Sequence, residues 1–154
     1  MTPTETASQA PAVRAARAAA WLAKQVEIAL SSVDLTGPQY RVLMLLGSGT
    51  ASATDAAERL AVSPPSVTAV IDGLVARQLV TRGHGTDDRR RVVLSLTDDG
   101  IAALAAADDA VADRLEELAN HGDTTTNPSE AFECLGWWLD AIKATGTARR
   151  SDPR

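Results

Sequence analysis

The spacing of apolar residues changes along the chain and predicts helices at both ends with a short stretch of strand between them. From Ala12 to about Ser31, and again from Asp98 onward, apolar residues recur every three or four positions, as on one face of an α-helix. Over residues 80–96 they alternate with polar residues, which is typical of a β-hairpin. The pattern therefore predicts a mainly α fold with one small β element.

Residues that favour helix starts divide the middle of the chain into three short helices. Three N-caps are predicted, at Thr36, Ser52 and Ser63. The first two are followed three residues later by Gln39 and Asp55, the spacing of a capping box. The third precedes Pro64, and proline fits the first helical position because its missing N–H is not needed there. The predicted helices end near Leu46, Leu60 and Arg77.

The third short helix has two unlike faces. Its apolar face comprises Val67, Val70, Ile71 and Leu74. Its other face comprises Pro65, Ala69, Asp72 and Ala76, flanked by Ser66, Thr68 and Gly73. We expect the apolar face to pack on the domain. The face of small residues can enter the major groove of DNA, which is wide enough for one helix.

A hairpin with a basic tip follows this helix. The predicted strands are residues 80–82 and 91–96, and the turn 83–88 is rich in Gly and Asp. Two short helices joined by a tight link and followed by such a hairpin describe a winged helix-turn-helix. A hairpin tip of this kind can place an arginine in the minor groove, where negative potential is concentrated.

The sequence around the hairpin resembles a known family. The run DRRRVVLSLT, residues 88–97, resembles the wing signature of MarR-type transcription regulators, D-x-R followed by a strand that ends in L-T. Residues 54–74 look like the helix-turn-helix of that family, and LTGPQY, residues 35–40, is similar to the start of its preceding helix. In element order the resemblance extends over residues 12–146. The two motifs at this spacing are together a specific signal.

This resemblance implies a winged helix-turn-helix DNA-binding lobe joined to a helical dimerisation lobe in a single domain, residues 12–146. The winged lobe would lie at residues 35–97. The dimerisation helices would lie at residues 12–34 and 98–146. The family implies a homodimer that binds a pseudo-palindromic operator. Its members are usually repressors, released by a small ligand or by thiol oxidation. The polar ends, residues 1–11 and 147–154, are expected to be a disordered arm and a disordered tail.

Residues expected to contact DNA lie at the start of the third short helix, at its end and in the hairpin. They are Ser63, Pro65, Ser66, Thr68, Ala69, Arg77, Arg89, Arg90 and Arg91. Arg90 is expected in the minor groove, and Asp88 is expected to orient the wing through an ion pair. Ser63 and Ser66 lie at a helix N-terminus, where a phosphate can be bound.

The chain departs from the family at two positions of this helix. Where Ala69 and Gly73 stand, the family often carries arginine or lysine, so fewer phosphate contacts are expected through the helix. More of the affinity would then depend on the wing and on Arg41 and Arg59, besides Arg77. Asp72 could accept a hydrogen bond from cytosine, but pairing with Arg77 or a wing arginine is the favoured reading.

The charge distribution supports a DNA-binding middle segment. The formal net charge of −5 alone argues against a nucleic-acid binder. Residues 59–91, however, hold six arginines against three aspartates, a net of +3. Residues 98–146 hold two cations against eleven acids, a net of −9. This asymmetry predicts one lobe that meets a polyanion and another that does not.

Composition argues against an enzyme or a metalloprotein. The single cysteine, Cys134, excludes an intrachain disulfide, and two histidines leave little for catalysis or zinc. We find no nucleophile–base set, phosphate loop or metal-ligand spacing, so no cofactor and no metal are expected. Cys134 is expected to be a buried structural residue rather than a redox sensor. Three tryptophans are expected in the dimer core rather than in a ligand cage: Trp21, Trp137 and Trp138.

The expected partners are double-stranded DNA, a second copy of the chain and a small lipophilic or aromatic effector. The chain lacks an apolar run of transmembrane length and a signal-peptide pattern, so a cytoplasmic location without membrane contact is expected. Two alternatives remain open. One is another winged-helix group, or an activator. The other is a protein-interaction module that has lost DNA binding, which Ala69, Gly73 and the net charge would favour.

Overall fold

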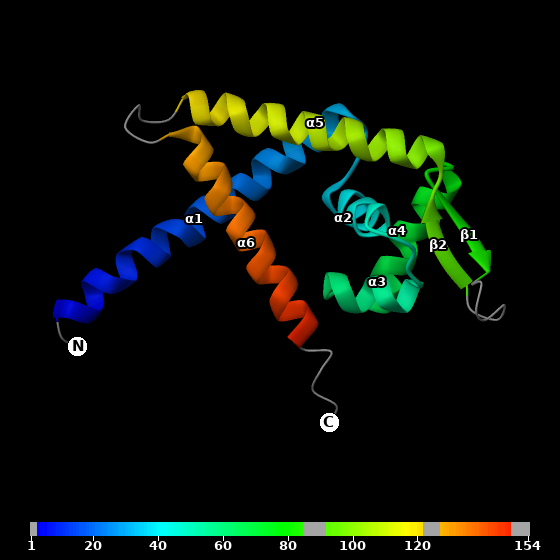
Figure 1. Cartoon of the computed structure of the whole chain (residues 1–154), viewed down its shortest axis with the longest axis horizontal. Coiled ribbons are helices and arrows are strands. Elements are labelled where there is room, and N and C mark those ends of the chain that lie inside the picture. Colours follow the sequence, from blue (N-terminus) through cyan, green and yellow to red (C-terminus); the bar gives the residue numbers. More distant parts are fainter. Residues whose placement is uncertain (1–2, 85–91, 122–126, 149–154) are drawn as a thin grey trace. The chain divides into compact units, whose positions relative to one another are not determined.

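The computed structural model describes residues 3–84, 92–121 and 127–148 (Figure 1). This part of the chain forms helices and one pair of strands, in the order α1 (Pro3–Ser32), α2 (Gly37–Gly47), α3 (Ala53–Leu60), α4 (Pro64–Ala76), β1 (Val80–His84), β2 (Val92–Leu96), α5 (Asp98–Asn120) and α6 (Pro128–Ala148). The mainly α fold with a small β-wing is therefore confirmed.

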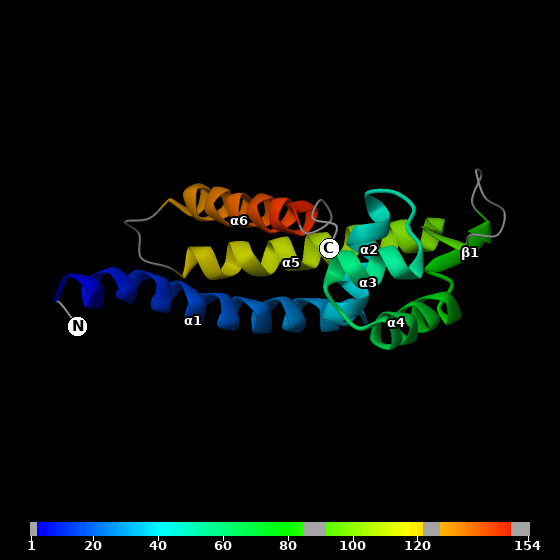
Figure 2. The same ribbon diagram turned by 90° about the horizontal axis from the view of Figure 1, so that it is seen from below.

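The chain divides into two compact units, Met1–Arg114 and Leu115–Arg154. The first unit holds α1 to α4, the hairpin and most of α5. The second holds the last residues of α5 and all of α6. Within the first unit, α2, α3, α4 and the hairpin cluster together, and they form the winged part of the molecule (Figure 2).

Local capping fixes the starts of the short helices as the sequence predicts. Thr36 Oγ1 accepts a hydrogen bond from the N–H of Gln39 at 3.4 Å, and Gln39 Oε1 accepts one from the N–H of Thr36 at 2.9 Å. The same reciprocal arrangement joins Ser52 and Asp55 at the start of α3. Each box satisfies backbone donors that a helix start leaves unpaired, so both predicted capping boxes are confirmed.

A single apolar core holds the winged part together. Its largest fully buried side chains are Leu30, Leu43, Ile71, Leu74, Leu94, Val42, Val67 and Val80. They come from the end of α1, from α2 and α4, and from both strands. Burying each of them contributes roughly 1.5–3 kcal/mol relative to an exposed side chain. The predicted inner face of α4 is confirmed, with Val70 half-buried at its margin.

The two strands pair antiparallel, with Val80 opposite Leu96 and Arg82 opposite Leu94. A further bridge joins β2 to the link between α2 and α3: the N–H of Leu94 donates to the carbonyl of Ala51 at 2.8 Å, and the N–H of Ala51 donates back at 3.3 Å. The strand β1 extends to His84, two residues further than predicted, because the ladder continues through Gly83.

The start of α5 lies directly against the end of α4 and β1. Thr97 Oγ1 donates to the carbonyl of Gln78 at 2.7 Å and accepts from the N–H of Gly100 at 3.0 Å, which caps the helix. A Cβ at Gly100 would lie 2.0 Å from the carbonyl oxygen of Leu79. Only glycine permits this approach, so α5 begins flush against the hairpin base.

The long first helix differs from the prediction at its start. The sequence predicts a disordered arm over residues 1–11, whereas α1 begins at Pro3 and passes through Pro11. Proline at the start fits a first turn, and the Glu, Gln and Ala residues that follow have high helix propensity. At the other end, α6 continues to Ala148, past the predicted end at Gly146, while residues 149–154 lie outside the described part.

The outer helices carry large apolar side chains that their own chain leaves exposed. Trp21 on α1 is 71% exposed, and Trp137 and Trp138 on α6 are 62% and 52% exposed. Cys134 is also exposed, so the prediction of a buried cysteine is wrong for the single chain. The reason is that no described side chain of α6 is buried. Among the described residues, no helix has the length and apolar character needed to span a membrane.

Candidate nucleic-acid interface

The exposed N-terminal half of α4 is the predicted recognition surface. Ser63 caps the helix, its Oγ accepting from the N–H of Ser66 at 3.4 Å, and the two hydroxyl oxygens lie 2.7 Å apart. Thr68 Oγ1 donates to the carbonyl of Pro64 at 2.8 Å. Five predicted contact residues are exposed here together: Ser63, Pro65, Ser66, Thr68 and Ala69. The structure thus brings them onto one surface, while the opposite face of α4 is in the core.

A tight left-handed link sets the angle between α3 and α4. Ala61 ends α3 with φ 53° and ψ 42°, and the N–H of Val62 donates to the carbonyl of Ala57 at 3.1 Å. A left-handed conformation is unusual for a residue with a Cβ. It reverses the chain within three residues, Ala61 to Ser63, and this compact turn makes α3 and α4 a helix-turn-helix.

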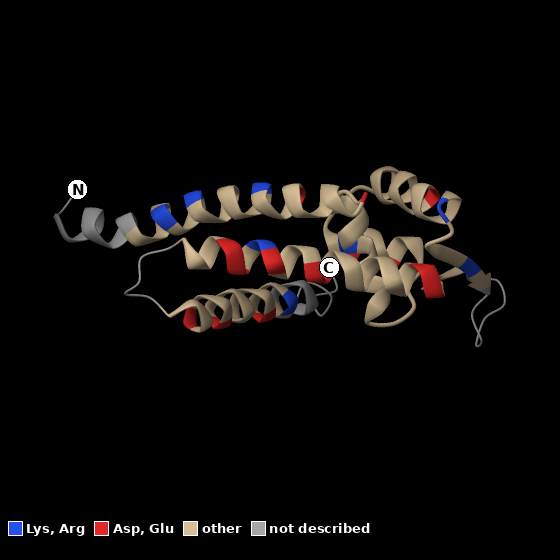
Figure 3. Cartoon of the chain, turned by 90° about the horizontal axis from the view of Figure 1, so that it is seen from above, with Lys and Arg blue, Asp and Glu red and all other residues tan. Residues whose placement is uncertain are grey.

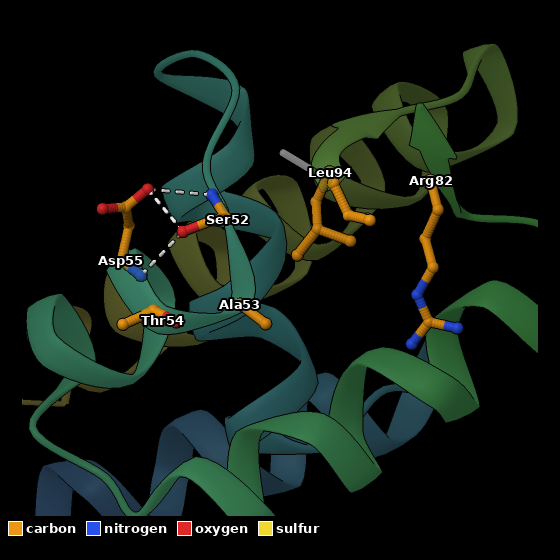
Figure 4. Close-up of a pocket in the computed structure, with 7 residues that line it drawn as sticks. Ser52, Ala53, Thr54, Asp55, Arg82 and Leu94 are labelled. Atoms are coloured by element: carbon orange, nitrogen blue, oxygen red, sulfur yellow. Dashed lines mark hydrogen bonds between the residues drawn. The ribbon is translucent and has the colours of Figure 1, made fainter. Parts of the chain in front are cut away.

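An ion pair ties α4 to the hairpin. Arg82 on β1 pairs with Asp72 on the outer side of α4. Figure 4 shows the Arg82 side chain extended away from its strand. This pairing confirms one of the two partners expected for Asp72, the wing arginine. It neutralises the carboxylate, which would otherwise repel a phosphate backbone, and fixes the base of the hairpin against the helix.

Arg77 is exposed, but its guanidinium is bound by Asp34 of the same chain. Its Nη1 donates to the backbone carbonyl of Asp34 at 2.6 Å, and its Nη2 lies 3.1 Å from the Asp34 carboxylate. The residue thus joins the end of α4 to the link between α1 and α2. DNA contact by Arg77 stays a prediction. The positive charge of its guanidinium is already paired with the Asp34 carboxylate. Arg41 and Arg59 are exposed.

Four predicted wing residues lie outside the described residues: Asp88, Arg89, Arg90 and Arg91. Their roles in orienting the wing and contacting DNA therefore stay predictions. The described strands pair from Val80–Leu96 to His84–Val92.

An open hollow of about 390 Å³ lies between the start of α3 and the hairpin. Its lining includes Ser52, Thr54, Asp55, Arg82 and Leu94, most of which Figure 4 labels. The polar atoms at the start of α3 bond to one another: Asp55 Oδ2 accepts from Ser52 N–H at 3.0 Å and from Ser52 Oγ at 2.7 Å. No pattern in the sequence predicts this hollow, because its walls come from segments that are far apart along the chain.

Two polar contacts hold α5 within the first unit, one to α2 of the winged part and one to α1. Tyr40 Oη donates to Asp108 Oδ1 at 2.5 Å, and Arg114 Nε donates to Gln25 Oε1 at 2.9 Å. Burial, the hydrogen bond to Asp108 and the charge of that carboxylate all raise the pKa of Tyr40 above its ordinary value. Neither contact was predicted, because the partners are 68 and 89 residues apart.

The part of the chain that follows the hairpin is rich in acidic residues. Figure 3 shows red segments along α5 and α6, with blue segments on α1. This distribution follows the charge asymmetry read from the sequence. Within the described ranges, no group of three or more His, Cys, Asp or Glu side chains is placed to hold a metal ion.

The tight link, the buried inner face of α4 and the adjoining hairpin define a winged helix-turn-helix protein. A model described as MarR family matches residues 33–91 of this chain. The curated relatives that the chain matches are named as transcriptional regulators.

Two curated relatives come from Bacillus subtilis (strain 168). The uncharacterized HTH-type transcriptional regulator YfiV is 40% identical over 68 residues, which are 44% of this chain and 42% of that protein. The HTH-type transcriptional repressor MdtR is 39% identical over 75 residues, 46% of this chain and 48% of that protein. The chain thus matches these relatives over about half of their length.

One solved structure extends the similarity to nearly the whole chain. It is the transcriptional repressor CouR bound to a 23-mer DNA duplex, which is 27% identical with a TM-score of 0.70. The match covers 92% of this chain and 98% of that one. A structure of CouR from Rhodococcus jostii RHA1 bound to p-coumaroyl-CoA has the same fold, with 20% identity, a TM-score of 0.70 and coverage of 88% of this chain and 93% of that one.

Proposed function

We propose that the protein is a sequence-specific DNA-binding transcription regulator that acts as a homodimeric repressor on a pseudo-palindromic operator. The observation that carries the proposal is the exposed N-terminal half of α4. Its opposite face is buried in the core, and the hairpin is fixed beside it by Asp72 and Arg82. A helix presented in this way fits the major groove.

The proposed DNA contacts fall into two groups. Ser63, Pro65, Ser66, Thr68 and Ala69 would face the major groove, with the N–H groups at the start of α4 near a phosphate. Arg89, Arg90 and Arg91 would follow the hairpin to the adjacent minor groove, with Asp88 orienting the wing. Arg77 has the weaker case, because Asp34 already binds its guanidinium.

The exposed apolar residues of α1 and α6 support a homodimer. Soluble chains rarely leave several large apolar side chains exposed on neighbouring turns, and such patches mark interaction surfaces. On α6 the patch comprises Leu135, Trp137, Trp138, Leu139 and Ile142, all exposed. A second copy of the chain would bury these side chains and align two recognition helices with two half-sites.

Repression and release by an effector are the finer part of the proposal. MdtR and CouR are both named as repressors, and CouR binds p-coumaroyl-CoA. By analogy, a small lipophilic or aromatic molecule would release this protein from its operator. The effector site and the effector itself would differ with the residues of each protein.

Fluorescence anisotropy with duplexes tiled across the DNA upstream of the gene tests this proposal. We expect one tile to bind tightly in the presence of competitor DNA, with affinity that falls as salt rises. Arg90→Ala should weaken that binding about tenfold. Its matched control is Arg17→Ala on α1, which should leave binding unchanged. Equal binding to every tile and to random DNA would contradict sequence-specific regulation.

A protein-interaction module is the second candidate. One observation favours it: α4 carries no cation, and its only charged residue is Asp72. Selection from random-sequence DNA separates the two candidates, because an interaction module would enrich no sequence.

A further inference from the structure

The side chains of α4 differ from those that usually read bases. Discrimination of guanine in the major groove generally uses arginine or lysine, and discrimination of adenine uses asparagine or glutamine. The helix Pro64–Ala76, which is described in full, contains none of these residue types. A contact with DNA through α4 therefore lacks the long bidentate donors on which most base recognition depends.

The polar groups that α4 does carry are already engaged within the chain. Thr68 donates its hydroxyl proton to the carbonyl of Pro64, and the hydroxyls of Ser63 and Ser66 bond to each other. Asp72, which could accept from a cytosine amino group, is paired with Arg82. Ser and Thr hydroxyls also discriminate poorly, because they can bond to either kind of base-edge group.

Beside these hydroxyls, the exposed groups of this surface are hydrocarbon. Pro65 presents its ring, Ala69 its methyl group and Thr68 a methyl group beside its engaged hydroxyl. The one base-edge feature in the major groove that favours apolar contact is the C5-methyl group of thymine. Removing two apolar groups from water is favourable, at roughly 0.8 kcal/mol for each methylene-sized group.

We propose that α4 reads its operator mainly through thymine methyl groups, which Pro65, Thr68 and Ala69 contact, and not through guanine or adenine hydrogen-bonding edges. This inference rests on the proposed DNA-binding function and specifies its ligand: a half-site with thymines at the positions that α4 covers. Affinity beyond these contacts comes from phosphates and from the wing, which do not depend on the methyl groups.

Base analogues test the proposal on the full-length protein. The probe is the tightest-binding duplex recovered by selection from random-sequence DNA. Replacing its half-site thymines by deoxyuridine removes only the C5-methyl group. We expect affinity to fall about fourfold for each contacted methyl. Replacing its guanines by 7-deazaguanine removes the major-groove acceptor N7, and this change should leave affinity within about twofold.

A variant connects the effect to α4. Thr68→Ser keeps the hydroxyl that bonds to Pro64 but removes the methyl group. Against the thymine duplex it should bind less tightly, and against the deoxyuridine duplex it should equal the parent protein. Ala69→Gly should behave in the same way, and Ala106→Gly on the exposed side of α5 controls for the helix destabilisation that glycine causes.

The outcomes separate this inference from the function on which it rests. Selection that enriches no sequence contradicts the proposed function itself. An enriched duplex that is insensitive to deoxyuridine, or that loses affinity with 7-deazaguanine, leaves the regulator intact and overturns methyl reading. An equal loss with deoxyuridine for Thr68→Ser, Ala69→Gly and the parent protein would assign the methyl contacts to another element and also overturn the proposal.

Discussion

The winged part and the α6 helix differ in how far their large apolar side chains are exposed to solvent. In α4 the side chains of Val67, Ile71 and Leu74 are all buried by α2, α3 and the hairpin. In α6 every large apolar side chain except Phe132 is exposed. Both helices carry several large apolar residues, but only those of α4 are covered by other elements of the chain. The winged part completes its core with residues of the first unit, whereas the large apolar side chains of α6 stay exposed in the single chain.

The largest effect is expected from a cavity in the core of the winged part. Leu74→Ala should lower the free energy of unfolding by about 2–5 kcal/mol, because it deletes buried methyl groups that neighbours cannot replace. Chemical denaturation followed by circular dichroism measures the change. Met44→Ala, at a position of α2 that is 42% exposed, is the control and should stay within about 0.5 kcal/mol. Similar losses for both variants would mean that the core is not where the structure places it.

A smaller effect, on association rather than folding, is expected from α6. Trp138 packs edge-on against Trp137, with ring centroids 5.0 Å apart. Trp138→Ala should raise the dimer dissociation constant about thirtyfold or more, as expected for loss of an interfacial hot spot of about 2 kcal/mol. Analytical ultracentrifugation measures it. Val92→Ala removes a comparably exposed apolar residue from the hairpin and should leave the dimer intact; weakening by both variants would remove the contrast between the regions.

The smallest effect concerns the contact between α2 and α5. Tyr40 is the single tyrosine of the chain, so tyrosinate absorbance reports on it alone. Because its pKa is raised in the folded state, the unfolded chain loses this proton first. The free energy of unfolding should therefore fall as pH rises above the ordinary tyrosine pKa of about 10. The folded protein should show little tyrosinate at a pH where the urea-unfolded protein is fully ionised.

Tyr40→Phe sharpens this test. It should cost about 1 kcal/mol at neutral pH through loss of the hydrogen bond to Asp108, and it should remove the part of the alkaline destabilisation that Tyr40 causes. A parent protein whose tyrosine ionises at the same pH folded and unfolded would contradict the contact.

Local chemistry explains which features could be predicted from the sequence. The caps at Thr36, Ser52 and Ser63 depend on residues three positions apart, so they are readable along the chain. The inner face of α4 follows from helical periodicity in the same way. These signals place the recognition helix and the hairpin. The pairing of Asp72 with a wing arginine was foreseen as one alternative because few cations lie nearby in sequence.

Other features depend on tertiary structure or on a partner. The contact of Tyr40 with Asp108 has no local signal, because nothing in either segment specifies the other. Arg77 was predicted from its position at the end of a recognition helix, yet a left-handed Asp34 brings a carboxylate to it. Cys134 was expected to be buried because its neighbours are apolar, but apolar neighbours show only that a surface will be covered by something.

The bridge between Ala51 and Leu94 has a mechanical consequence. Leu94 pairs with Arg82 in the β-ladder, and Arg82 forms an ion pair with Asp72 on α4. One transverse line of contacts therefore runs from the α2–α3 link through both strands to the recognition helix. A displacement of the start of α3 would therefore be transmitted along these contacts, and the hairpin and the recognition helix would move together as one unit.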